Sequence, residues 1–178
     1  QDDFEYGLTD YEDISGSGPV PAVWFNTAAL GTFLAVLDRT SAPEVQKHFD
    51  IGPDHSGPLE VSFDLYEIDS WDGTPLYIST SAGNVSIRFN DGVPEATSGT
   101  TGGVAWTVTT QGPVTTGSVF GAAADYVHRI ALTFTPTDQM VTLAFGIGVG
   151  STNGGGASDA LGFGRHSQKC EVRSAKCE

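Results

Sequence analysis

The chain has 178 residues, of which 39% are hydrophobic, so it can bury the core of one domain of ordinary size. Its net charge of −14 disfavours binding to nucleic acid or to anionic membranes, and it contains no apolar run long enough to insert into a bilayer. With 23 glycines and 9 prolines, turns must be frequent, which favours an all-β fold.

The first part of the chain predicts three strands before its central segment. Residues 1–19 are acidic and then rich in glycine and serine, so they are a poor strand candidate. Apolar content then rises, and the last of these strands has the alternation of an exposed edge. The three predicted strands are 20–25, 31–37 and 44–49.

The central segment is a strand that ends in a cluster of acids. Val61, Phe63 and Leu65 alternate with polar residues and with Tyr66, as expected for a half-buried strand. Three carboxylates then follow within six residues, beside a tryptophan, before Gly73 turns the chain; they are Glu67, Asp69 and Asp72. Acids this close repel one another unless a cation, a shared proton or solvent compensates them.

Alternating hydrophobic residues predict six further strands, separated by turn signals at Asn90-Asp91-Gly92 and Gly112-Pro113. In the last of these strands, Ala144, Gly146 and Gly148 form a face with small side chains that a backbone or a ligand can approach. The whole pattern predicts a two-sheet antiparallel β-sandwich, of jelly-roll type. The six strands are 76–79, 85–89, 104–109, 114–120, 126–134 and 141–149.

The end of the chain differs in composition from the rest. Residues 1–164 are predicted to form the single domain, and residues 165–178 a basic tail or the start of a further module. Cys170 and Cys177 are interpreted as one disulfide or as halves of two, which indicates an oxidising compartment. An N-terminal glutamine is typical of a mature end after cleavage. Asn84 begins the N-glycosylation sequon Asn84-Val85-Ser86.

Three short segments resemble a family of secreted jelly-roll modules of bacterial and algal surface proteins, which are similar to carbohydrate-binding modules and concanavalin-like domains. The segments are Asp3-Phe4-Glu5 with Gly7, the block from Phe63-Asp64 to Trp71-Asp72-Gly73, and the run from Ser158-Asp159 to Gly162-Phe163; Leu30-Gly31-Thr32-Phe33-Leu34 fits the same pattern. Where that family has an Asp-Asn pair on its last strand, this chain has Gly164-Arg165.

The resemblance implies a structural calcium ion held by the N-terminal Glu5 and by acids near the return of the chain. The residues also give a physical basis for it, because Asp69, Asp72 and the carbonyl groups between them can supply several of the six to eight oxygens that calcium takes. Asp159 or Glu5 would complete the site. The alternative is an acidic turn that is solvated and holds no metal.

The same acidic block is also similar to the E-x-D-x-x-E signature of laminarinase-like glycoside hydrolases. By that resemblance Glu67 would be the nucleophile, Asp69 its supporting acid and Asp72 the acid/base of a retaining hydrolase. Asp72, the third acidic residue of the block, is one methylene shorter than the glutamate that ends the signature.

The function expected from these patterns is non-catalytic. We expect a calcium-stabilised module, secreted or displayed at a cell surface, that acts in structural assembly, adhesion or carbohydrate binding. Its partners would be an extracellular glycan, copies of itself or other surface proteins, and Trp71 would stack on a sugar ring. His128 has the parity of the buried residues in its strand and is interpreted as half-buried rather than as a ligand.

Overall fold

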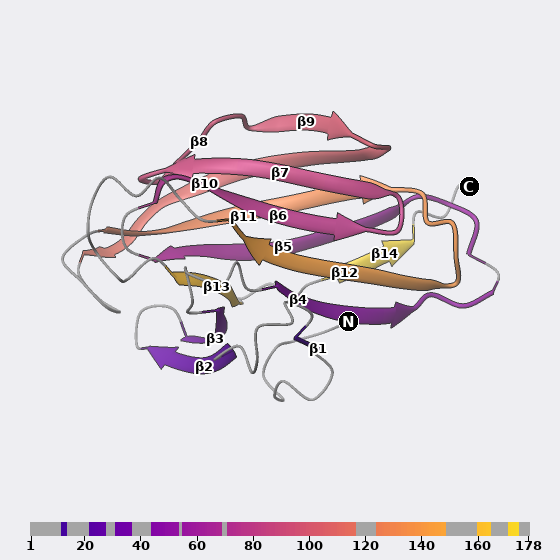
Figure 1. The fold of residues 1–178 in the computed structure, drawn as a ribbon, viewed down its shortest axis with the longest axis horizontal. Coiled ribbons are helices and arrows are strands. Elements are labelled where there is room, and N and C mark those ends of the chain that lie inside the picture. The colour runs from indigo at the N-terminus through magenta and orange to yellow at the C-terminus, as the bar shows by residue number, and fades with distance from the viewer. Residues whose placement is uncertain are drawn as a thin grey trace.

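A computed structural model describes the chain at residues 12–13, 22–27, 31–36, 44–53, 55–68, 71–116, 124–148, 160–164 and 171–174. These residues form two antiparallel sheets, which confirms the predicted β-sandwich; the jelly-roll assignment stays a prediction. The longer strands run roughly along the longest dimension of the molecule (Figure 1). No helix within the described residues could cross a membrane.

One sheet, which we call sheet I, has the strand order β1-β4-β12-β6-β7-β8. Its centre is β12, which pairs with β4 on one side and with β6 on the other. The strands of sheet I are β1 (Glu12–Asp13), β4 (Glu44–Asp50), β6 (Asp72–Thr80), β7 (Gly83–Asn90), β8 (Val93–Pro94) and β12 (Met140–Ile147).

The other sheet, sheet II, has the order β2-β3-β13-β5-β11-β10-β9, and β14 also pairs with β5. The longest of its strands, which form its centre, carry the core residues that are described in this sheet. The strands of sheet II are β2 (Ala22–Thr27), β3 (Gly31–Val36), β5 (Leu59–Ile68), β9 (Ser98–Thr101), β10 (Val104–Thr116), β11 (Ala124–Phe134), β13 (Ala160–Gly164) and β14 (Glu171–Ser174).

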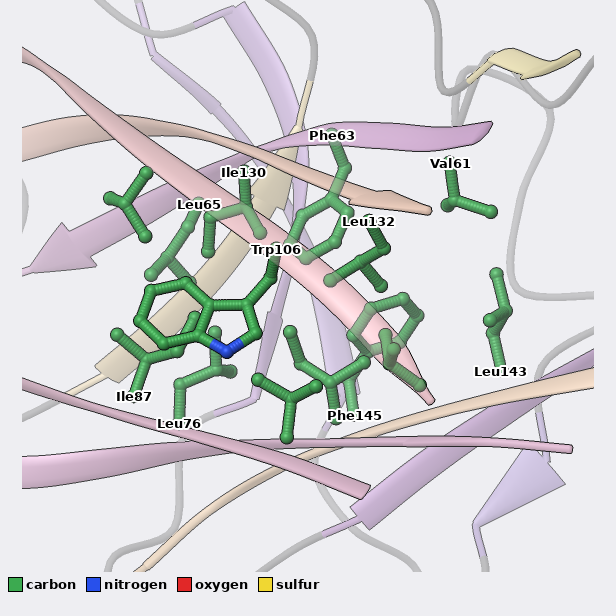
Figure 2. Packing of buried hydrophobic residues seen from close by; sticks show 14 of the residues in the cluster. Val61, Phe63, Leu65, Leu76, Ile87, Trp106, Ile130, Leu132, Leu143 and Phe145 are labelled. Atoms are coloured by element: carbon green, nitrogen blue, oxygen red, sulfur yellow. The ribbon is translucent and has the colours of Figure 1, made fainter. Parts of the chain in front are cut away.

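The core lies between the two sheets and follows from the alternation of residues along each strand. Every second residue of a strand points to the same face, so apolar residues at that spacing turn one face of each sheet inward. Figure 2 shows Trp106 projecting from β10 among apolar side chains of both sheets. Of the labelled residues, sheet II provides Val61, Phe63, Leu65, Trp106, Ile130 and Leu132, and sheet I provides Leu76, Ile87, Leu143 and Phe145.

The turn predicted at Asn90-Asp91-Gly92 is confirmed. Asn90 pairs with Val93, so a two-residue loop joins β7 to β8. Asp91 and Gly92 both have positive φ angles, of 47° and 82°, as a type I′ hairpin turn requires. This turn brings the backbone of Gly92 to one end of the sandwich interior.

The prediction of a turn at Gly112-Pro113 is wrong. β10 continues through both residues to Thr116, and its pairing with β11 shifts register between Thr110 and Pro113 and again before Thr115. Such an irregularity bends a strand without ending it, and the positive φ of Gly112, 89°, fits a bulge as well as a turn. The segments expected as two strands are therefore one, as far as residue 116.

Five strands lie outside the segments that the sequence predicts: β1, β8, β9, β13 and β14. β8 and β9 are only two and four residues long. β14 lies in the part of the chain predicted to be a tail, and it pairs with residues 59–62 of β5, while β13 pairs with residues 64–68 of the same strand. Part of the predicted tail thus extends sheet II.

Candidate functional site

Glu67, the first residue of the acidic block, points into the sandwich. It shares the inward parity of Val61, Phe63 and Leu65, and its side chain is fully buried. Its Oε1 accepts a hydrogen bond from the backbone N–H of Gly92, at 2.9 Å. Its Oε2 lies 2.8 Å from Nε2 of His128. The carboxylate of Glu67 is therefore compensated by a histidine and by a backbone amide of the protein itself.

His128 connects this carboxylate to β10. It is fully buried, more so than the half-buried position that the sequence predicts. Since a carboxylate accepts hydrogen bonds, we place a ring proton on Nε2, and Nδ1 lies 3.0 Å from the hydroxyl oxygen of Thr110. The Phe89 ring packs against the imidazole, with 4.5 Å between centroids. The interior here is a satisfied polar cluster among apolar side chains.

Trp71 lies in the core and does not offer a face to solvent. Its exposed fraction is 0%, and its ring meets Phe89 edge to face at 5.8 Å. Its carbonyl oxygen accepts hydrogen bonds from the backbone N–H groups of Gly73 and Asp91, both at 3.1 Å. Trp71, which was predicted to stack on a sugar, thus packs in the core and stabilises the turn after β7.

Most of the predicted calcium ligands lie outside the described residues. This holds for Glu5, Asp69 and Asp159, and for Asp72 the structure describes only its place as the first residue of β6. Within the part of the chain that is described, no group of three or more histidine, cysteine or acidic side chains has the arrangement of a metal site. The calcium prediction therefore stays a prediction, as does the pairing of Cys170 and Cys177, which also lie outside the described residues.

The outer face of sheet II is closed around the middle of β5 and β11. Asp64 and Tyr66 point outward there but are buried. The Arg129 guanidinium donates to both carboxylate oxygens of Asp64, at 2.5 and 2.9 Å. Burial raises the pKa of the Tyr66 phenol above its usual range, and the nearby Asp64 charge adds to that effect, while Arg129 opposes it. This part of the face is a buried polar contact.

The outer face of sheet I carries an exposed aromatic ring. Tyr77 of β6 is 45% exposed, on the opposite side of the strand from the buried Leu76 and Ile78. It pairs with Gly146 of β12, which has no side chain to cover the ring. A Cβ added to Gly148 would lie only 2.8 Å from the ring, so the absence of a side chain there also leaves room for Tyr77.

A hollow of about 270 Å³ lies beside this ring. Its polar walls are Ser79 of β6 and the exposed Asn84 of β7, which pair directly with each other. Gly146 lies on the same face. The hollow is slightly smaller than the pockets of about 300–1,000 Å³ that hold whole small ligands. It therefore suits one ring of a larger molecule that lies across the sheet.

A second, larger hollow of about 740 Å³ lies at the β7–β8 end of sheet I. Arg88, which donates to the carbonyl oxygen of Gly73 at 2.9 Å, forms one wall, and the exposed Val93 another. The aromatic residue among its described lining, Phe89, is fully buried. This hollow offers charge and an apolar edge but no ring on which a sugar could stack.

A comparison with models of known protein families finds no match, and neither does a comparison with curated proteins. Tyr77 and the pair of Glu67 and His128 were not predicted as a site. The parity of Tyr77, opposite to that of its apolar neighbours, was the available signal that its ring faces solvent.

Proposed function

We propose that this chain is a non-catalytic carbohydrate-binding module of an extracellular or cell-surface protein, and that the outer face of sheet I binds the glycan. The observation that supports this most is the exposed ring of Tyr77 beside a hollow with hydroxyl and amide walls. A sugar ring has an apolar face that packs on an aromatic ring, and hydroxyl groups that bond to polar side chains. This face offers both kinds of contact.

The glycan proposed is uncharged. No charged side chain lines the hollow among the described residues, and the chain as a whole carries a net charge of −14. An anionic polysaccharide would be repelled by that charge, whereas a neutral one would not.

The geometry gives the hydrolase alternative no support. A retaining glycosidase needs its nucleophile within reach of the anomeric carbon, in a cleft that admits the substrate. Glu67 is fully buried and both of its oxygens are bonded, to Gly92 and His128. Of the hydrolase set, Asp69 lies outside the described residues, and only the backbone position of Asp72 is known.

Calcium remains part of the proposal as a stabilising ion. Because Glu67 is compensated inside the sandwich, the acids left to hold the ion in this part of the chain are Asp69 and Asp72. Asp72 is the first residue of β6 and follows the connection from β5. An ion bound there would brace that connection and would stabilise the folded state by binding to it alone.

A panel of immobilised neutral and anionic polysaccharides tests the binding proposal. We expect retention by at least one neutral glycan, lost in Tyr77→Ala and kept in Tyr77→Phe, which preserves the ring. Retention by none, together with concentration-dependent self-association, would instead favour the role in structural assembly or adhesion. Equal retention of Tyr77→Ala and the unaltered protein would refute the assignment of the site.

A further inference from the structure

We propose that Asn84 is a site of N-glycosylation and that its own glycan covers the Tyr77 hollow, so that modification and binding of an external glycan exclude each other. This inference concerns the site of the proposed function and rests on it for the effect on binding. It rests separately on the positions of the sequon residues on β7. The molecule that we place in the hollow is thus a glycan attached covalently to the protein itself.

Both sequon residues project from the same outer face as Tyr77. Asn84 and Ser86 are two residues apart on β7, so they point to one side, and both are exposed, whereas Val85 between them is buried in the core. A sugar on the Asn84 amide therefore meets no obstruction from the strand that carries it. The sequon lies in the sheet and belongs to the surface that we assign to the ligand.

The register of β6 and β7 brings the amide close to the hollow. Asn84 is directly opposite Ser79, and Ser86 is directly opposite Tyr77. Tyr77 is therefore the diagonal neighbour of Asn84, and such neighbours are about 7–8 Å apart, within reach of long or aromatic side chains. The first sugar of a glycan on Asn84 starts at the wall of the hollow and can lie against the Tyr77 ring.

The modification is the ordinary transfer of a glycan from a lipid-linked diphosphate donor. The bond between C1 of the first sugar and the diphosphate oxygen breaks, a bond from that carbon to Asn84 Nδ2 forms, and one amide proton leaves with the lipid diphosphate. The step requires a secretory pathway that contains this donor. In such a host we expect the unmodified and the modified chain to differ in their access to Tyr77.

The experiment uses the full chain secreted from glycosylating eukaryotic cells, with Ser86→Ala to remove the sequon and Ser86→Thr to retain it. Intact mass gives the occupancy of Asn84. Tyrosine nitration, read by peptide mass at Tyr77, gives the accessibility of the ring whether or not the protein binds a glycan. A control sequon made by Ala105→Asn, completed by Thr107, lies on the exposed outer face of sheet II.

We expect Asn84 to be occupied in the unaltered chain and in Ser86→Thr, and nitration of Tyr77 to be at least about fivefold slower in these than in Ser86→Ala. Affinity for the neutral polysaccharide should fall by at least about tenfold on modification, but not when the glycan is on the control sequon in a Ser86→Ala background. An unoccupied Asn84, or equal nitration with and without the glycan, would overturn the inference. If the glycan slows nitration but no form of the protein binds a polysaccharide, the proposed function is refuted, whereas the inference that the Asn84 glycan covers Tyr77 is supported.

Discussion

The buried pair of Glu67 and His128 makes a stability prediction that the structure specifies closely. Replacing Glu67 by alanine removes the acceptor of both the His128 ring N–H and the Gly92 backbone N–H. Each buried group left without a partner costs about 1–3 kcal/mol. Breaking a buried pair by removing one member typically costs about 3–5 kcal/mol in all. We therefore expect Glu67→Ala to lower the free energy of unfolding by about 3–5 kcal/mol.

Glu67→Gln should behave differently, because glutamine can satisfy the same partners. Its carbonyl oxygen can accept from Gly92, and its amide can donate to Nε2 of His128 if the ring proton moves to Nδ1, where Thr110 can accept it. The expected loss is about 1 kcal/mol. The contrast between alanine and glutamine tests the hydrogen bonding itself, since both substitutions remove the negative charge.

Denaturant titration and thermal melting measure these changes. For a domain of this length, about 3–5 kcal/mol corresponds to a fall in Tm of about 6–20 °C. The matched control is Glu60→Ala, which removes an exposed glutamate from the same strand and should change stability by no more than about 0.5 kcal/mol. A loss in Glu67→Ala no larger than in Glu60→Ala would refute the account of the buried cluster.

Three further predictions concern pH, metal and catalysis. Because burial raises the folded-state pKa of Tyr66, the contribution of this phenol to stability is complete below the unfolded pKa of about 10 and is lost as pH rises above it. Tyr66→Phe should therefore reduce the fall of the free energy of unfolding between pH 9 and 11.5, measured by denaturant titration. The same fall in the variant and in the unaltered protein would contradict this prediction. A chelator should lower Tm by about 5–10 °C, as expected for an ion present at about a hundred times its Kd. The chelator should cause no such shift in Asp72→Asn. An unchanged Tm in the unaltered protein would refute the calcium proposal. Incubation with β-glucan should release no reducing ends, and a release abolished by Glu67→Gln would restore the hydrolase.

The class of fold could be predicted because it depends on local patterns. Alternation in β5, β11 and β12 identifies strands with one buried face, and the Asp91-Gly92 dipeptide identifies a hairpin turn. The short strands β8 and β9 could not be predicted this way. β8 is only a valine and a proline, and β9 consists of small or polar residues. Both strands exist because β7 and β10 give them a partner.

The site depended on pairings between distant parts of the chain, which one sequence does not reveal. The parity of Glu67 already placed it on the inward face of β5, but only the register of β5 with β11 brings His128, 61 residues later, against it. Trp71 was expected to stack on a sugar ring. Its burial results from packing against Phe89 on a neighbouring strand. Likewise the hollow exists because β12 places Gly146 beside Tyr77.

The most direct test of the proposed site is a backbone amide NMR titration of the isotopically labelled protein with a soluble oligosaccharide of the glycan that it retains. We predict that the amides that shift most belong to residues 77–79, 84–86 and 144–148, with saturation at one ligand per chain. Shifts confined to residues 88–95, or to the outer face of sheet II, would contradict the claim that Tyr77 and the hollow beside it form the binding surface.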